Sequence, residues 1–294
     1  NEIKLKNIKH FDFIILSHLH YDHYSGFAQV LDYCLNNNIS IGFFLHTFTN
    51  DFLSILNLGF KSKKIEANTF AFLSKIQECK QKNIILDLDS VSQNFRNIDL
   101  CNGIALKFLA PTGNDSLNLS RQKANYQNGL STNVPDFNIM STIIEISNSK
   151  HNILLTGDAT SKTFKRINNI IKTKSKLIQV PHHGSKKNLE KQFWVNLIRE
   201  SNCPSVFSVG DVKKDKLPNK EVVDFFEQNS FYNTSTNLVY GLLEHYSQNN
   251  ISNTTNTRAI SLSLTPFSRT RTTNTLPPSN DRFNGDKVFI ISLS

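Results

Sequence analysis

The sequence predicts an α/β fold, because strand-like and helix-like segments alternate along most of its 294 residues. Short apolar runs rich in β-branched and aromatic residues are typical of buried strands, and residues 11–16 and 143–146 are two of them. Between such runs, apolar residues recur at spacings of three and four, which indicates helices with one buried face. Several predicted strands end in polar loops, where we expect the chemistry to lie.

The remaining elements follow from the same patterns. Predicted strands span residues 11–16, 40–45, 84–86, 104–109, 143–146, 151–158, 177–180 and 206–209. Predicted helices span residues 27–35, 52–58, 70–79, 162–171 and 189–199. Residues 18–26 are predicted as a polar loop, and the composition of residues 112–138 (Asn, Ser, Gly and Gln) predicts a long loop that is disordered or faces substrate.

Composition sets further limits. Lys and Arg number 33 against 24 Asp and Glu, a net charge of +9 that favours acidic partners such as nucleic acid or phosphate esters. No apolar run reaches about 18 residues, so no membrane span is predicted. The four cysteines lie far apart, which is typical of core thiols in a reducing compartment. No secretory signal is visible, so we expect a cytoplasmic protein, provisionally, because a chain that opens with Asn1 is processed or part of a longer one.

The most informative segment follows the first predicted strand. His18, His20, Asp22 and His23 place three imidazoles and one carboxylate within six residues. Alternate residues of an extended turn point the same way, so His18 and His20 can hold one ion, while Asp22 and His23 face a neighbouring position. Imidazole nitrogen and carboxylate oxygen suit Zn²⁺, with Mn²⁺ or Fe as alternatives.

Two later strands deliver further ligands. Asp158 follows an apolar strand and a glycine, where a carboxylate either caps the next helix or bridges two cations roughly 3.5–4 Å apart. His182 and His183 follow the strand at residues 177–180. One of these histidines can coordinate metal, and the other can donate to a substrate oxyanion or move a proton. Gly184 leaves space for close backbone approach.

Taken together, His18-x-His20-x-Asp22-His23, the Thr-Gly-Asp158 strand and Val-Pro-His182-His183-Gly-Ser185 resemble the metallo-β-lactamase fold superfamily. The last motif is similar to the hydrolase domain of ComEC-type DNA-uptake proteins and their stand-alone relatives. The resemblance implies an αββα sandwich with metals at one edge of two packed sheets. Members usually begin with strands before the His cluster, and here those strands are either missing from the N-terminus of this chain or supplied by another part of a longer protein. Residues 1–248 would form the hydrolase domain, and residues 249–294 a Ser/Thr/Asn-rich extension with terminal strands of the same unit.

The resemblance also implies site roles. The expected metal ligands are His18, His20, Asp22, His23, Asp158 and His182, with two Zn²⁺ or Mn²⁺ ions per chain. Asp22 and His183 are expected to be catalytic. Many members carry a separate histidine between the first cluster and the bridging Asp; here His46 and His151 lie in that interval, with His46 the better placed and a core or surface role the alternative for both.

These features predict a metal-dependent hydrolase of phosphodiester bonds, a nuclease or phosphodiesterase, in which a hydroxide bridging two zinc ions is the nucleophile. Ser185 and Lys186 are expected to bind the substrate, although a lysine pair at residues 186–187 is equally typical of a solvated helix start. The alternatives are a metallohydrolase of a lactone, thioester or other ester, and a binding module with a degenerate site. Nucleic acid or another phosphodiester is the expected partner.

Overall fold

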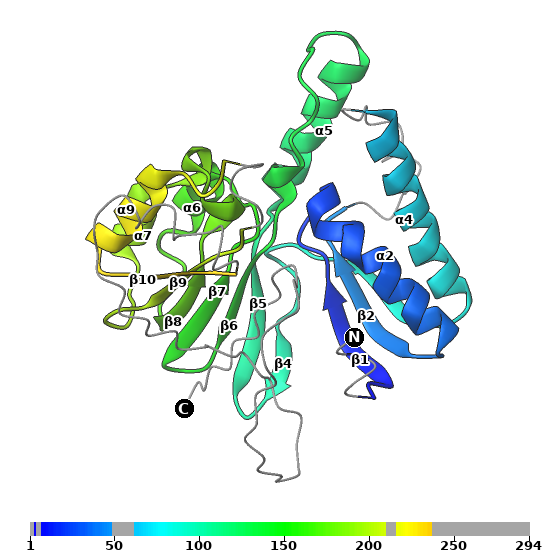
Figure 1. Ribbon diagram of the computed structural model, residues 1–294, viewed down its shortest axis with the longest axis horizontal. Coiled ribbons are helices and arrows are strands. Elements are labelled where there is room, and N and C mark those ends of the chain that lie inside the picture. The colour runs from blue at the N-terminus through cyan, green and yellow to red at the C-terminus, as the bar shows by residue number, and fades with distance from the viewer. Residues whose placement is uncertain (1–2, 4–6, 49–61, 210–215, 237–294) are drawn as a thin grey trace, which may run out of the picture.

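The structure, a computed structural model, describes residue 3 and residues 7–48, 62–209 and 216–236. It is a mixed α/β fold with two sheets and six α-helices among these residues (Figure 1). The strands are β1 (His10–Ile15), β2 (Ser40–His46), β3 (Ile85–Ser90), β4 (Ile98–Cys101), β5 (Ile104–Ala110), β6 (Ile143–Ser147), β7 (His151–Leu155), β8 (Lys174–Gln179), β9 (Pro204–Phe207) and β10 (Tyr232–Ser235). The helices are α2 (Tyr21–Asn36), α4 (Lys63–Gln81), α5 (Gly113–Gln127), α6 (Ser161–Ile167), α7 (Lys191–Asn196) and α9 (Lys220–Gln228), with short 3-10 turns η1 (Phe137–Met140), η2 (Pro181–Gly184) and η3 (Lys186–Asn188).

The smaller sheet has three parallel strands in the order β1-β2-β3. The larger sheet has seven strands in the order β10-β9-β8-β7-β6-β5-β4. From β4 to β7 each pair of neighbouring strands is antiparallel, whereas from β7 to β10 each pair is parallel. Parallel neighbours end at the same sheet edge, so the loops after β7 and β8 meet there.

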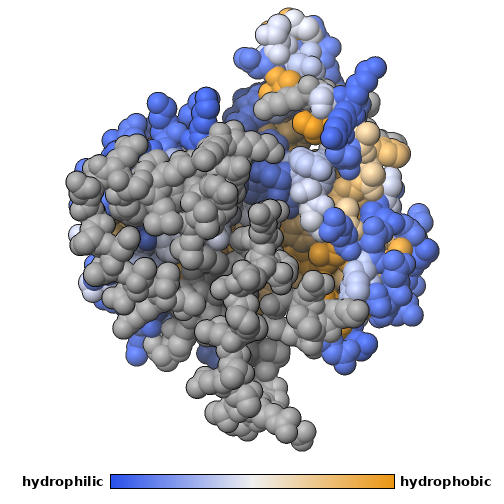
Figure 2. Space-filling model, viewed as in Figure 1, coloured by the Kyte–Doolittle hydropathy of each residue, from blue (hydrophilic) through white to orange (hydrophobic). Residues whose placement is uncertain are grey.

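Each sheet buries one face under helices. Phe164, Trp194, Phe207 and Phe226 belong to the core between the larger sheet and α6, α7 and α9. A second core joins the smaller sheet to α2 and α4. A third contains residues of both sheets, among them Leu45 of β2, so the two sheets share apolar contacts. The outer ends of α2 and α4, at the lower right of Figure 2, are mainly hydrophilic.

The α/β prediction is confirmed, and most predicted elements are present with shifted ends. The polar loop predicted at residues 18–26 is wrong in its second half, because α2 begins at Tyr21. Tyr24 is buried there and stacks on Phe72 of α4, a tertiary contact that holds this turn in place. The strand β4, the helix α9 and the strand β10 were not predicted. The predicted helix at residues 52–58 and the extension at residues 249–294 lie outside the described residues.

The long loop predicted at residues 112–138 is also wrong, since α5 occupies its first half. A capping box starts this helix: the Thr112 backbone N–H donates to Asp115 Oδ2 at 2.8 Å. The same oxygen accepts a hydrogen bond from Arg166 of α6 at 2.6 Å. Leu119 packs into the core beside α2 and α4. These few contacts stabilise a helix whose composition, on its own, is typical of a loop.

The cysteines whose side chains are described are core thiols, as predicted. Cys34, Cys79 and Cys203 are free and buried. Burial raises the pKa of the Cys203 thiol to about 12 and of Cys34 to about 11, so these thiols stay protonated at neutral pH. Of the described helices, none combines the length and apolar character needed to cross a membrane.

We predict that Phe226→Ala destabilises the fold by about 3–5 kcal/mol, because it leaves a cavity among packed aromatic rings. The Phe226 ring is fully buried, and its centroid lies 5.3 Å from that of Trp194 and 5.0 Å from that of Phe231. Urea unfolding followed by circular dichroism measures the loss. Val195→Ala, at a position 51% exposed on α7, should change the unfolding free energy by less than about 0.5 kcal/mol. Equal losses in the two variants would show that this core does not carry the stability of the fold.

Candidate metal centre

The candidate site forms where three loops meet. His18 and His20 follow β1 in the smaller sheet, whereas Asp158 and the His182–His183 pair follow β7 and β8 in the larger one. Backbone hydrogen bonds join these loops: the His182 N–H donates to the Gly157 carbonyl at 3.0 Å, and the Thr142 N–H donates to Ser17 at 3.0 Å. The second bond crosses from one sheet to the other. The loops are therefore held together by the backbone as well as by side chains.

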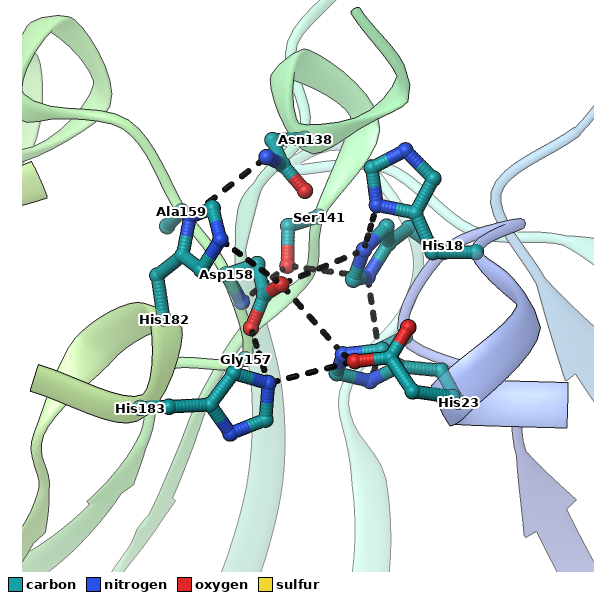
Figure 3. Close-up of polar contacts among 12 residues, drawn as sticks. His18, His23, Asn138, Ser141, Gly157, Asp158, Ala159, His182 and His183 are labelled. Atoms are coloured by element: carbon teal, nitrogen blue, oxygen red, sulfur yellow. Dashed lines mark hydrogen bonds and ion pairs between the residues drawn. The ribbon is translucent and has the colours of Figure 1, made fainter. Parts of the chain in front are cut away.

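The carboxylate of Asp158 lies at the centre of the site and is almost fully buried (Figure 3). Its Oδ2 lies 3.3 Å from His23 Nε2, 3.7 Å from His18 Nε2 and 3.8 Å from His182 Nε2. Its Oδ1 lies 3.9 Å from His183 Nε2. One carboxylate thus faces four imidazoles drawn from both sheets.

Two groups of side chains share Asp158. The first consists of His18, His20 and Asp158, and the second of Asp22, His23, Asp158 and His183; within each, ligand atoms lie within 4.8 Å of one another. The structure thus places His18 with His20, and Asp22 with His23. That these groups bind metal stays a prediction.

The geometry of the first group fits a tetrahedral ion. His18 Nε2 and His20 Nδ1 are 3.1 Å apart. Two imidazole nitrogens on one tetrahedral zinc lie roughly 3.3 Å apart, given Zn–N bonds of about 2.0–2.1 Å. Bringing two neutral nitrogens this close costs free energy unless a proton or a cation lies between them. A shared cation satisfies both lone pairs.

The second group contains an unpaired buried nitrogen. His23 Nε2 has no hydrogen-bond partner among the described residues, although Asp158 Oδ2 and Asp22 Oδ2 lie 3.3 and 3.6 Å away. A buried polar atom without a partner is costly in free energy. A cation between this nitrogen and the carboxylate oxygens would satisfy all three, so these residues fit a second metal ion.

Neighbouring groups orient the imidazoles by their other ring nitrogen, as expected of metal ligands. Ser17 Oγ lies 3.2 Å from His18 Nδ1 and 3.1 Å from His23 Nδ1. His183 Nδ1 donates to the carbonyl of Ser208 at 2.5 Å, which directs Nε2 toward the carboxylates. Ser141 Oγ accepts a hydrogen bond from the backbone N–H of Asp158 at 2.8 Å and so holds the central carboxylate.

Charge is strongly coupled within the site. Burial opposes ionisation of Asp158, but contact with His23 and the charge of His18 hold its pKa well below the usual value. Burial likewise raises the pKa of Asp22, but a hydrogen bond from His183 lowers it to about 2. Burial lowers the pKa of His183, yet that bond and the charge of Asp158 raise it to about 9.

The first group behaves differently. Burial is the main cause that lowers the pKa of both His18 and His20, well below the usual range for His18. Both imidazoles are therefore neutral at pH 7 and have a lone pair to offer. One ionised carboxylate and two neutral imidazoles are the protonation states that a divalent cation needs at the first group, whereas His183 of the second group has to release a proton before its Nε2 can bind a cation.

The tandem histidines adopt an unusual backbone. His182 and His183 both have positive φ, 47° and 55°, a conformation that L-residues rarely adopt. It separates the two imidazoles, whose centroids are 6.0 Å apart with planes at 79°. Among the described residues, His183 lies with the second candidate group and His182 with neither, whereas the resemblance implied the metal role for His182. The metal role of His182 stays a prediction.

Asn138 contacts Nδ1 of His182, whereas Nε2 is the ring nitrogen of His182 that lies near Asp158. Asn138 Nδ2 lies 3.4 Å from His182 Nδ1, and Asn138 Oδ1 is buried with no hydrogen-bond partner in the part of the chain described. Exchanging the two amide atoms would let Oδ1 accept the Nδ1–H of His182. His182 Nε2 would then direct its lone pair at Asp158, as a metal ligand does.

The other expected site residues lie elsewhere. His46 is buried and stacked on Phe48, with ring centroids 3.8 Å apart, and His151 pairs with Glu200 at 3.2 Å; neither joins a candidate group. Lys186 is exposed at the start of η3, and Ser185 is half-buried beside the histidine loop. Their substrate-binding role stays a prediction.

A cavity of about 440 Å³ opens beside the candidate metal groups. Its lining includes His20, Asp158 and His182 together with residues from the starts of α2 and α4 and from the segment before η1. Sequence reasoning missed Tyr21, Asp136 and Asn138 of this lining, because no local pattern marks residues that meet only in three dimensions. Comparisons with protein-family models and with curated proteins find no match for this chain.

We predict that Gly184→Ala disturbs the histidine loop more than a substitution at an equally strained glycine. Gly184 has φ of +83°, and an added Cβ would lie 2.6 Å from Pro218 Cβ and 2.9 Å from Phe207 Cδ1. Overpacking of this kind costs about 1–3 kcal/mol beyond the backbone strain. Gly103→Ala is the matched control, since its φ is +73° but nothing lies within 4 Å of the added atom. Urea unfolding measures both, and equal destabilisation would contradict the packing argument.

Proposed function

We propose that the protein is a divalent-metal-dependent hydrolase of phosphodiester bonds with a dinuclear site. The observation that carries the proposal is the Asp158 carboxylate, which two His/Asp groups share. A carboxylate common to two ligand sets is how a protein holds two cations a few ångströms apart. The first ion would be held by His18, His20 and Asp158, and the second by Asp22, His23, Asp158 and His183.

His182 would be a further ligand of the first ion. The three protein ligands of the first group leave one position of a tetrahedral ion open. Either a further protein ligand or a solvent molecule can fill that position. His182 Nε2 lies 3.8 Å from Asp158 Oδ2, on the side of the first group that opens into the cavity. The tandem histidines would therefore serve different ions.

The proposal includes the αββα arrangement of the metallo-β-lactamase type. Its support is the set of three apolar cores: one under α2 and α4, one shared by the sheets, and one under α6, α7 and α9. In such an arrangement the loops at the shared edge of the sheets carry the site, which is where Asp158 and its histidine partners lie.

When bound, two divalent cations supply a hydroxide nucleophile at neutral pH and neutralise charge on a phosphodiester. The chain's own residues have three tasks. Asp22, whose side chain is 58% exposed, orients the attacking water and accepts its proton. His183 holds Asp22 through a contact of 3.2 Å. Asp158, ionised and buried, keeps the imidazoles oriented around it.

Charge favours a phosphodiester over a neutral ester. The net charge of +9 attracts a polyanion, and Lys186 and Lys187 follow the histidine loop directly. A lactone or thioester hydrolase has no need of such charge. The site residues alone are compatible with hydrolysis of a phosphodiester, a lactone or a thioester, so the assignment of a phosphodiester substrate rests on charge.

We expect about two zinc or manganese ions per chain in protein purified without chelator, measured by mass spectrometry. Asp158→Asn removes the charge shared by both groups and should reduce the content to well below one ion. Asp136→Asn is the matched control, because Asp136 lines the same cavity but belongs to neither candidate group. Its metal content should equal that of the wild type. A wild type without bound metal would overturn the proposal and favour the binding module.

We expect the metal-loaded protein to hydrolyse bis(p-nitrophenyl) phosphate, and a chelator to abolish the activity. Asp22→Asn should lower kcat about 100-fold or more, because the amide cannot accept a proton from water. Release of p-nitrophenol at 405 nm is the assay, and readdition of manganese or zinc after chelation is the control. Cleavage of a lactone or thioester with the diester left intact would contradict the assigned substrate class.

A further inference from the structure

The cavity beside the metal groups has a distinct composition. Six of its lining residues are apolar or aromatic: Leu19, Tyr21, Ile65, Val134, Pro135 and Phe137. The other residues that line it are His20, Asp22, Asp136, Asn138, Asp158 and His182. At about 440 Å³ it falls in the size range of small-molecule sites, about 300–1,000 Å³. It is large enough for one flat organic group next to the ions.

The charge of the cavity lining disfavours a phosphate group in addition to the scissile one at the ions. Among the described residues that line the cavity there is no lysine or arginine, and the charges away from the histidines are the carboxylates of Asp22, Asp136 and Asp158. Asp22 and Asp158 are candidate metal ligands, so Asp136 is the charge that faces the rest of the cavity. A phosphate group beside Asp136 would be repelled, whereas an uncharged group, or one that donates hydrogen bonds, would be accepted. The scissile phosphate therefore lies at the ions, and what enters the cavity is an uncharged part of the substrate.

Tyr21 supplies an aromatic surface for that group. Its side chain is 48% exposed at the start of α2, and its ring meets Tyr24 edge-on with centroids 5.6 Å apart. Tyr24 is itself buried and hydrogen-bonded to Thr69 of α4 at 2.7 Å, so the support beneath Tyr21 is rigid. An exposed, supported aromatic ring is the usual stacking partner of a nucleobase.

The walls come from segments that flank the mouth. Ile65 lies in the first turn of α4, and residues 134–138 connect α5 to η1. Figure 1 shows the beginning of α4 near the projecting α5, above the start of α2. A base within a duplex is stacked on both faces and paired along one edge, and it enters such a recess only after flipping out, at a cost of a few kcal/mol.

We propose that this cavity is a subsite for one unpaired nucleobase adjacent to the scissile phosphate, so that the substrate is single-stranded nucleic acid or a short oligonucleotide. The inference rests on the proposed phosphodiester hydrolysis. It adds a recognition element, a base stacked on Tyr21, that hydrolysis itself does not require. Asp136 lines the cavity and already accepts a hydrogen bond from the Asn138 N–H through Oδ1, so its other carboxylate oxygen can accept one from an amino or imino group of the base.

Calorimetric titration of the metal-loaded protein tests the subsite without turnover. Thymidine 5′-monophosphate and 2-deoxyribose 5-phosphate carry the same sugar and phosphate, and only the first carries a base. We expect the nucleotide to bind about tenfold more tightly or better, and Tyr21→Ala to remove the difference, while Tyr21→Phe retains it. Tyr232→Ala, at a position 47% exposed on β10, is the matched control and should bind both ligands as the wild type does. Equal affinities for the two ligands in the wild type would overturn the subsite.

Oligonucleotide cleavage gives the second readout. We expect a single strand to be cut at least about tenfold faster than the same sequence in a duplex, and Tyr21→Ala to raise KM for the single strand. A duplex cut as fast as the single strand would overturn the inference. Failure of the underlying function is separate: a wild type that leaves bis(p-nitrophenyl) phosphate intact but still binds the nucleotide through Tyr21 retains the subsite and loses the hydrolase.

Discussion

The buried carboxylate of Asp158 is the constraint on which the site depends. An ionised carboxylate in an apolar setting is costly unless opposite charge or hydrogen-bond donors surround it. Here four imidazoles lie within 3.9 Å of its oxygens, and the Ser141 side chain accepts from its backbone N–H. His18 and His23 come from the segment that follows β1, and His182 and His183 come from the loop that follows β8, so the relative position of these segments follows from the need to satisfy one charge.

Two sheets are needed to deliver these partners. The histidines after β1 approach from the smaller sheet, and the tandem histidines approach from the larger one. The core shared by the sheets, with Leu45 on one side and Ile144 and Ile153 on the other, keeps the two loop sets in register. The hydrogen bond from Thr142 to Ser17 fastens the same junction through the backbone. The geometry of the site therefore depends directly on how the two sheets pack against each other.

Backbone strain is concentrated where the chemistry is expected. His182 and His183 occupy the left-handed region in succession, and Gly184 follows them in a space that admits no side chain. Strained residues of this kind persist where the surrounding structure holds them, and they cluster at functional sites. The consequence here is geometric, because two adjacent residues present imidazoles in different directions, one toward Asp22 and one toward the cavity.

Local sequence determined much of this protein. Apolar strands ending in His18, Asp158 and His182 could be read directly, because the periodicity of a strand and the residues after it are local properties. The helix α5 could not, since its stability depends on a capping box and on Arg166, about 50 residues away. Nor could the grouping of His183 with Asp22, or the joining of Tyr21 to Asp136 and Asn138 around one cavity. These pairings depend on how two sheets pack, and packing is decided by the summed burial of distant residues, which no short segment of sequence contains.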